Sequence, residues 1–115
     1  MSEEVLSASF DSHLDALGHV DRRRLLLALL DAKTAGGLPV EIDRLERDTA
    51  TTPLRVSMHH VHLPKLDDYG IVDANRDRYT VTPGPRFDEI RPLLELLDEN
   101  RDRLPDDWLS PSRRR

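Results

Sequence analysis

The stretch from Thr52 to Val72 constrains the fold of this chain more than any other. Thr52-Pro53 is a helix start signal, because a threonine hydroxyl caps free N–H groups and proline pre-sets the first helical position. Gly70 can take the left-handed conformation that commonly closes a helix. Ile71-Val72-Asp73-Ala74 follows at once and has β-propensity. A helix that ends at a glycine and runs straight into strands predicts a recognition helix followed by a wing.

The remaining elements complete this arrangement. Tyr79-Thr80-Val81-Thr82 is a second β-propensity run, joined to the first by the polar loop Asn75–Arg78. Apolar spacing predicts helices over residues 9–17, 22–33 and 88–103, a small strand over 39–42 and a short helix from Asp43. In order, this is helix, helix, strand, helix, helix, strand, strand, helix. The predicted class is mainly α with a small β-hairpin wing, a winged helix-turn-helix.

The domain boundaries follow from the same pattern. We expect a disordered N-terminus over residues 1–8, a winged helix-turn-helix domain over 9–86, a C-terminal helix suited to dimerisation over 87–104, and a flexible basic tail over 105–115. Within that tail, Trp108 is the only large anchor, and Arg113–Arg115 is read either as a basic arm or as simple disorder. The second helix should be the most buried element, through Leu25, Leu26, Leu27, Leu29 and Leu30.

Composition narrows the class of protein. There are no cysteines, so neither disulfides nor thiolate metal sites can form. No apolar run approaches the roughly 18 residues of a membrane span, and the acidic start Met1–Glu4 differs from a signal peptide. We therefore expect a soluble cytoplasmic protein without a membrane association.

Two segments resemble a known class of regulators. Leu17-Gly18-His19-Val20-Asp21-Arg22-Arg23-Arg24-Leu25-Leu26-Leu27-Ala28-Leu29-Leu30 resembles the opening L-G-x-x-x-R-R-x-I-L-x-x-L of arsenical-repressor-like (ArsR-like) winged-helix regulators. His62-Leu63-Pro64-Lys65-Leu66-Asp67-Asp68-Tyr69-Gly70-Ile71-Val72 resembles the H-L-x-x-L-x-x-x-G-L-V end of their recognition helix. The His-Val-His-Leu-Pro-Lys-Leu version is similar to a family of small haloarchaeal winged-helix domains of unassigned function. The resemblance covers roughly residues 10–100 and implies dimeric DNA binding.

The charge pattern has two readings. The net charge is −5, only Lys33 and Lys65 among 17 basic residues are lysine, and aspartate outnumbers glutamate by 15 to 7. Such a composition resembles that of halophilic proteins adapted to high internal salt, and a GC-rich genome that favours arginine codons is the alternative. The cysteine ligands of metal-sensing ArsR-like members are missing, so the resemblance does not carry metal sensing.

The predicted recognition helix has two faces. On a regular helix, Val56, His59, Leu63 and Leu66 share the face that docks on the second helix. The opposite face offers Leu54, Ser57, Met58, Val61, His62 and Lys65, with Arg55 to one side. Base-reading helices usually offer Arg, Lys, Asn or Gln, so this face is unusually apolar. The expected DNA-binding residues, including two from the wing, are Arg55, Ser57, Met58, Val61, His62, Lys65, Arg76 and Arg78.

Several features leave alternatives open. Arg76 and Arg78 are read as phosphate or minor-groove contacts, or as a solvated hairpin with an Arg–Asp pair. Arg22–Arg24 are read as backbone-phosphate contacts, or as a solvated face with one or two acid partners. Pro64 should bend the helix, either as a tolerated kink or to tilt its first turns toward a groove or a ligand.

Catalysis and metal binding have little support. His59 and His62 are three residues apart, but the helical wheel puts His59 inward and His62 outward, so a structural role is favoured over a metal site. There is no glycine-rich phosphate loop or HExxH motif. Asp67 and Asp68 are adjacent and point to different faces. We expect no enzyme activity, no metal, no cofactor and no small-molecule ligand.

Two functions remain. The first is a transcriptional regulator that binds double-stranded DNA as a homodimer. Its protomers would pair through the terminal helices, at Leu14, Leu17, Ile90, Leu94 and Leu97. The second is a protein-interaction module on the same scaffold, with Leu54, Met58 and Val61 as its contact stripe.

Overall fold

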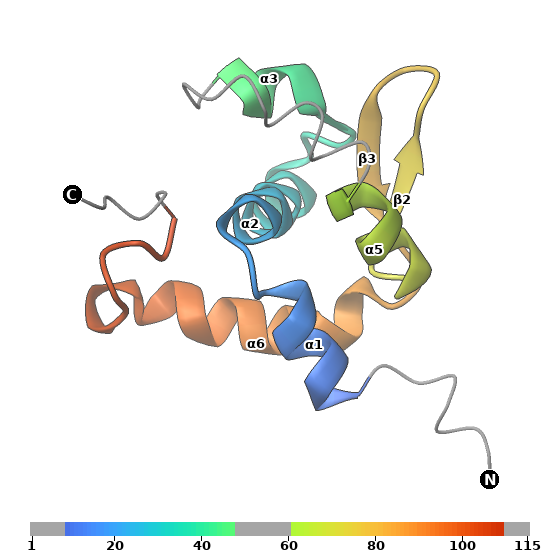
Figure 1. Cartoon of the computed structure of the whole chain (residues 1–115). Coiled ribbons are helices and arrows are strands. Elements are labelled where there is room, and N and C mark those ends of the chain that lie inside the picture. Colours follow the sequence, from blue (N-terminus) through green and yellow to red (C-terminus); the bar gives the residue numbers. More distant parts are fainter. Residues whose placement is uncertain (1–8, 48–60, 110–115) are drawn as a thin grey trace, which may run out of the picture.

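Helix α2 (Val20–Ala35) is the central element around which the others pack (Figure 1). The computed structural model describes residues 9–47 and 61–109, and it is mainly helical with a small three-stranded antiparallel sheet. The other helices are α1 (Phe10–Ala16), α3 (Ile42–Arg47), α5 (Leu63–Asp68) and α6 (Phe87–Glu99), followed by a 3-10 turn at Arg101–Arg103. The strands are β1 (Val40–Glu41), β2 (Val72–Asn75) and β3 (Thr80–Pro83).

The predicted burial of α2 is confirmed. Leu25, Leu26 and Leu29 are fully buried, and Leu27 and Leu30 are each 6% exposed. The helix begins where the His19 Nδ1 accepts a hydrogen bond from the Asp21 N–H, and it ends at Gly36 in the left-handed conformation. The caps define the ends of α2, and its leucines on several sides place it in the middle of the core.

The sheet has the order β1-β3-β2. Val81 of β3 pairs with Val40 on one side and with Ala74 on the other, and its side chain is fully buried. The strands of the hairpin lie one residue later than predicted, and their turn spans residues 76–79. One sheet face therefore joins the core, while the turn projects into solvent.

Two glycines join α5 to the hairpin and to α6. Gly70 has a φ of +76°, which favours glycine because a Cβ is strained there. A Cβ on Gly84 would lie 2.5 Å from the Gly70 carbonyl oxygen, so the two backbones can approach only without a side chain. The Gly84 N–H also donates to the Ile71 carbonyl over 2.8 Å.

The terminal helices expose only part of the predicted dimer surface. Leu17, Ile90 and Leu94 are buried within the protomer, so their assignment to a dimer interface is wrong. Leu14 is 49% exposed, and Phe10 beside it on α1 is 62% exposed. The sequence pattern could not separate the core positions from the free ones, because both follow the same helical spacing.

The C-terminal end differs from the predicted flexible tail. Residues 104–109, which we name the strap, follow the 3-10 turn, and Trp108 and Leu109 within them pack partly buried against the core. Trp108 thus serves as the anchor that was expected of it, while residues 110–115 and the N-terminal 1–8 lie outside the described residues. Among the described helices, none combines the length and the apolar character needed to cross a membrane.

Candidate nucleic-acid interface

The start of α5 carries the described part of the predicted recognition helix. Val61 is 48% exposed, as expected for an outward residue, but His62 is only 2% exposed. The prediction that His62 points outward is wrong. Residues 61 and 62 form a wider, π-type turn just before Pro64, which suits a residue without an N–H. Because that turn changes the angular step per residue, the wheel drawn for a regular helix loses its phase there.

Two consecutive arginines cap the C-terminal end of α1. Arg22 donates from NH2 to the Asp15 carbonyl over 2.8 Å and from Nε to the Ala16 carbonyl over 3.1 Å. Arg23 donates from NH1 to the Leu17 carbonyl over 2.8 Å. These carbonyls are the acceptors that the end of a helix leaves free. The two arginines and these three carbonyls form what we name the arginine junction.

The arginine junction reaches α5 through His62. Arg22 donates from NH1 to the His62 Nδ1 over 3.0 Å, and arginine can only donate. The imidazole therefore accepts at Nδ1 and holds its proton on Nε2. Burial, followed by the electrostatic effects of His19, Arg22 and Lys65, lowers the pKa of His62 from 6.5 to about 4. His62 is a neutral, buried contact at physiological pH.

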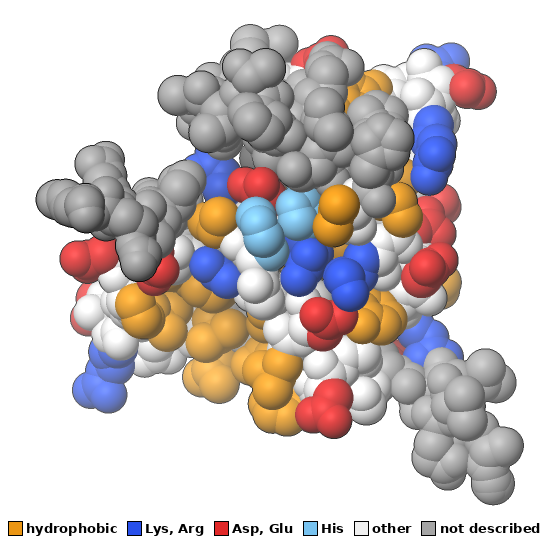
Figure 2. All heavy atoms as spheres, in the orientation of Figure 1, with side chains coloured by type: hydrophobic (Ala, Val, Ile, Leu, Met, Phe, Trp, Pro, Cys, Tyr) orange, Lys and Arg blue, Asp and Glu red, His pale blue; other side chains and the backbone are white. Residues whose placement is uncertain are grey.

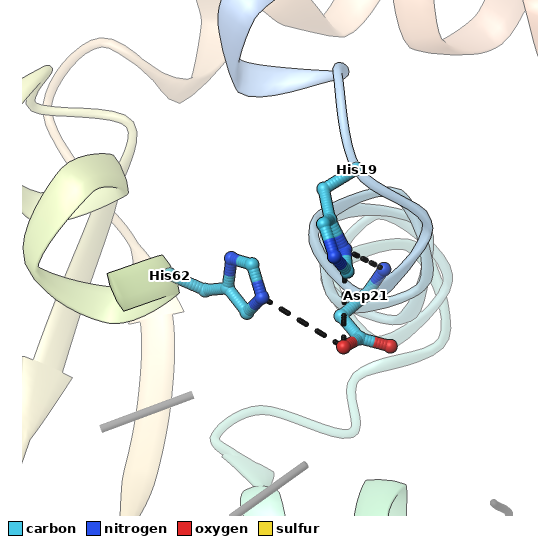
Figure 3. A group of neighbouring side chains, drawn as sticks. All are labelled: His19, Asp21 and His62. Atoms are coloured by element: carbon cyan, nitrogen blue, oxygen red, sulfur yellow. Dashed lines mark hydrogen bonds and ion pairs between the residues drawn. The ribbon is translucent and has the colours of Figure 1, made fainter. Parts of the chain in front are cut away.

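His62 also faces Asp21 and His19 at the start of α2 (Figure 3). One ligand atom of each residue lies within 4.8 Å of the others, a spacing that suits a metal ion. A metal-ligating imidazole normally donates its second N–H to an acceptor. Here the second nitrogen of each ring accepts instead, from Arg22 and from the Asp21 N–H. An Nδ1 that accepts a hydrogen bond cannot orient its ring in this way, so the hydrogen bonds of this cluster do not favour a metal.

Lys65 is held by an ion pair within the protomer. Its Nζ lies 2.8 Å from the Asp15 Oδ2, and the Tyr69 hydroxyl donates to the same oxygen. These two hydrogen bonds lower the pKa of Asp15, and the carboxylate raises the pKa of Tyr69. Lys65 therefore joins α5 to α1, which competes with the base contact predicted for it.

The hairpin turn carries the exposed arginines of the predicted interface. Arg76 and Arg78 are both exposed, and the Arg78 N–H donates to the Asn75 side-chain oxygen over 3.1 Å. The outer face of the hairpin forms an open groove of about 510 Å³, lined by Pro39, Asp73, Ala74, Asn75, Arg76, Asp77, Arg78, Thr80 and Thr82. The arginine side chains are accessible to a ligand that approaches this face.

The structure gives each arginine of the Arg22–Arg24 triplet a partner within the protomer, and the Asp15 carboxylate lies 4.0 Å from Arg22. Contact with phosphate stays a prediction. Arg23 donates from Nε to the Trp108 carbonyl over 2.8 Å and from NH2 to the Asp107 carbonyl over 3.1 Å. Arg24 donates from NH1 to the Leu109 carbonyl over 3.0 Å. The acceptors of the triplet are thus mainly backbone carbonyls. A signal was present, because three arginines follow directly on the end of a helix whose carbonyls need donors.

The structure brings together only part of the predicted set. Val61, His62 and Lys65 lie on one turn, while Arg76 and Arg78 lie on the hairpin. Arg55, Ser57 and Met58, like Leu54, Val56, His59 and His60, lie outside the described residues. Sequence reasoning missed Asp15 and Tyr69, whose contacts join segments more than 50 residues apart.

Hydrophobic side chains gather over the region of α1 and α6 (Figure 2). Among the described residues, Phe10, Leu14 and Leu96 are large hydrophobic side chains of these two helices that are 49–62% exposed. We name these three residues the terminal-helix patch. Leu93 and Leu97 of α6 are partly buried and pack against the core. Exposed apolar residues on two neighbouring elements indicate a contact surface.

The comparisons with known proteins identify a family without a known function. The sequence profile of a family described as a domain of unknown function (DUF7344) matches residues 14–82, which is more than half of the chain. The match runs from α1 through the hairpin and ends before α6. No curated protein and no solved structure matches the chain.

Proposed function

The chain belongs to the DUF7344 family of unknown function, and from its geometry we propose that it is a DNA-binding transcriptional regulator of the winged-helix type. In this proposal α5, with the residues before it, is the recognition helix and the β2–β3 hairpin is the wing. The protein acts as a homodimer on double-stranded DNA. It has no catalytic role and works in the cytoplasm.

One observation carries the proposal. Helix α5 passes through Gly70 directly into the β2–β3 hairpin, and β1 joins the outer side of β3 to complete the sheet. This order of helix, hairpin and third strand is that expected of a winged helix, in which helix and wing lie beside each other for contact with DNA. The exposed Arg76 and Arg78 at the turn supply positive charge at the wing tip.

The contacts beneath α5 support a rigid reading element. Lys65, Tyr69 and Asp15 connect α5 to α1, and the Arg22–His62 hydrogen bond connects it to α2. A recognition element held from below by two sets of polar contacts keeps a fixed angle to the wing. Fixed geometry is what base or backbone recognition requires, because each contact depends on the register of the others.

The homodimer is proposed through the terminal-helix patch. Phe10 and Leu14 on α1 and Leu96 on α6 remain exposed after the protomer has formed its core. A two-fold contact buries the same patch on both protomers. Leu14→Glu and Leu96→Glu should therefore yield monomers, detected by light scattering after size exclusion. Unchanged dimer mass in both variants would place the contact elsewhere.

The test of DNA binding is a mobility-shift titration with duplex DNA from the upstream region of the gene, over a salt series. Arg76→Ala combined with Arg78→Ala should weaken binding and reduce the slope of log K against log salt by about 2, since each phosphate contact contributes about 0.9. Arg101→Ala combined with Arg103→Ala is the control matched in charge, because both are exposed arginines after α6.

The outcomes separate wing contact from general charge. Equal losses in the double Arg101→Ala and Arg103→Ala control and in the wing variant would show that only the net charge matters. The absence of a shifted band for the wild-type chain at every salt concentration would refute DNA binding. Arg55→Ala, chosen from the sequence pattern, should also abolish binding.

A second candidate is a protein-interaction module on the same scaffold. It is favoured by the engagement of Lys65 and His62 within the protomer, which leaves Val61 as the exposed side chain among these three neighbours. An exposed valine suits an apolar partner better than a base edge. Met58→Asp, chosen from the sequence pattern, would then abolish partner capture in a pull-down, whereas retention of every partner would refute this candidate.

A further inference from the structure

Hydrogen bonds to the backbone carbonyl oxygens of the strap hold it against α2. The carbonyls of Asp107, Trp108 and Leu109 all accept hydrogen bonds from Arg23 or Arg24, over 2.8–3.1 Å. Arg23 thus binds the first two of these carbonyls, and Arg24 binds the third. These acceptors are carbonyl oxygens, which carry no net charge.

The strap is anchored by its apolar side chains. Trp108 and Leu109 are partly buried against the core, and the Arg23 guanidinium lies 5.3 Å from the centroid of the Trp108 ring. The strap also brings one acidic residue to this site, since the charge of Asp107 acts on Arg23. It therefore presents carbonyl oxygens and negative charge to α2, which are the features of a nucleic-acid backbone.

One buried polar group of the strap lacks a hydrogen-bond partner. The indole N–H of Trp108 is buried and has no hydrogen-bond partner among the described residues. A buried donor without an acceptor carries its desolvation penalty uncompensated, which weakens the closed position. Movement of the strap into solvent would satisfy this N–H. The strap also lies outside residues 14–82, the part that the family profile matches.

We propose that Arg23 and Arg24 form a phosphate-binding surface that the strap covers and that the DNA backbone uncovers. Phosphate oxygens are charged acceptors, and hydrogen bonds from arginine to such acceptors are shorter and about twice as strong as those between neutral groups. Phosphate therefore replaces the strap carbonyls, while Arg23 keeps its bond to the Leu17 carbonyl. This inference rests on the proposed DNA binding, and it makes the strap an autoinhibitory element.

The test opens the strap without altering charge or length. Trp108→Ser combined with Leu109→Ser removes both apolar anchors, and Leu38→Ser is the control for loss of an exposed apolar side chain outside the strap and the terminal-helix patch. Binding to a 20-base-pair duplex of random sequence is measured over a salt series. The strap variant should bind more tightly, with a salt slope steeper by about 2 for two added phosphate contacts. Adding Arg24→Gln should remove about half of that increase.

The outcomes distinguish the two proposals. If wild type and strap variant bind DNA equally, DNA binding stands and the strap proposal falls. If neither binds, both proposals fall. Circular dichroism checks that the strap variant is folded. A second readout needs no variant: Trp108 is the only tryptophan, so its fluorescence should shift to longer wavelength when wild type is saturated with DNA. An unchanged emission at saturation would overturn the strap proposal.

Discussion

The buried imidazole of His62 makes the stability of the fold depend on pH in a defined window. Its pKa is lowered from 6.5 to about 4, so the unfolded chain binds a proton there more readily than the folded chain. Stability from this group is present above pH 6.5 and is lost as the pH falls toward 4. With about 1.4 kcal/mol per pKa unit, the loss relative to neutral pH is about 2 kcal/mol at pH 5 and about 3 kcal/mol at pH 4.

The assay is urea unfolding of wild type and of His62→Asn at pH 7, 6 and 5. Asparagine places a side-chain oxygen near the position of the imidazole Nδ1, where it can accept from Arg22, and it does not titrate. The wild type should lose about 2 kcal/mol more than the variant between pH 7 and pH 5. Asp15 does not interfere, because its lowered pKa moves its contribution to below its ordinary value of 3.8.

The pH dependence of the two proteins can also contradict the burial of His62. Parallel pH dependence of wild type and His62→Asn would mean that His62 takes up its proton without cost in the folded state. The burial of the ring and its bond to Arg22 could not then be as described. A variant that is less stable at every pH but has a flat profile would still support the account, because the comparison rests on the slope.

Three further substitutions test the packing. Leu94→Ala should lower the free energy of unfolding by about 2–5 kcal/mol, because Leu94 is fully buried; a loss near zero would show that it is exposed. Gly84→Ala should cost about 1–3 kcal/mol, since the new Cβ would meet the Gly70 carbonyl; an unchanged urea midpoint would contradict that approach. Asp15→Asn should cost at most about 1 kcal/mol, because the ion pair with Lys65 is partly exposed; a larger loss would mean a drier contact.

Local patterns predicted much of the fold. The leucines of α2 recur at helical spacing, and all five that were named are buried. Gly70 was identified as the end of a helix, and the structure gives it the positive φ that this role needs. The two β-runs differ from the observed strands by a single residue. These features depend on neighbours in the sequence, which is why periodicity and turn chemistry could reveal them.

The polar contacts could not be predicted in this way. The position of His62 depends on a π-type turn that a regular wheel does not include. The acceptors of Arg23 in the strap lie about 85 residues away in the sequence. The same helical spacing predicted Leu94 and Leu14, yet one is buried and the other is half exposed. Tertiary packing decides each of these positions and contacts, and short-range sequence patterns carry no information about it.

We propose that this chain recognises DNA through the β2–β3 hairpin and the residues around α5. The most direct measurement is genome-wide mapping of the tagged protein on DNA in its native cells, with the Arg76→Ala and Arg78→Ala double variant mapped in parallel. If the chain recognises DNA in this way, we expect discrete peaks for the wild type that disappear in the variant. A uniform profile for the wild type, indistinguishable from that of the variant, would contradict it.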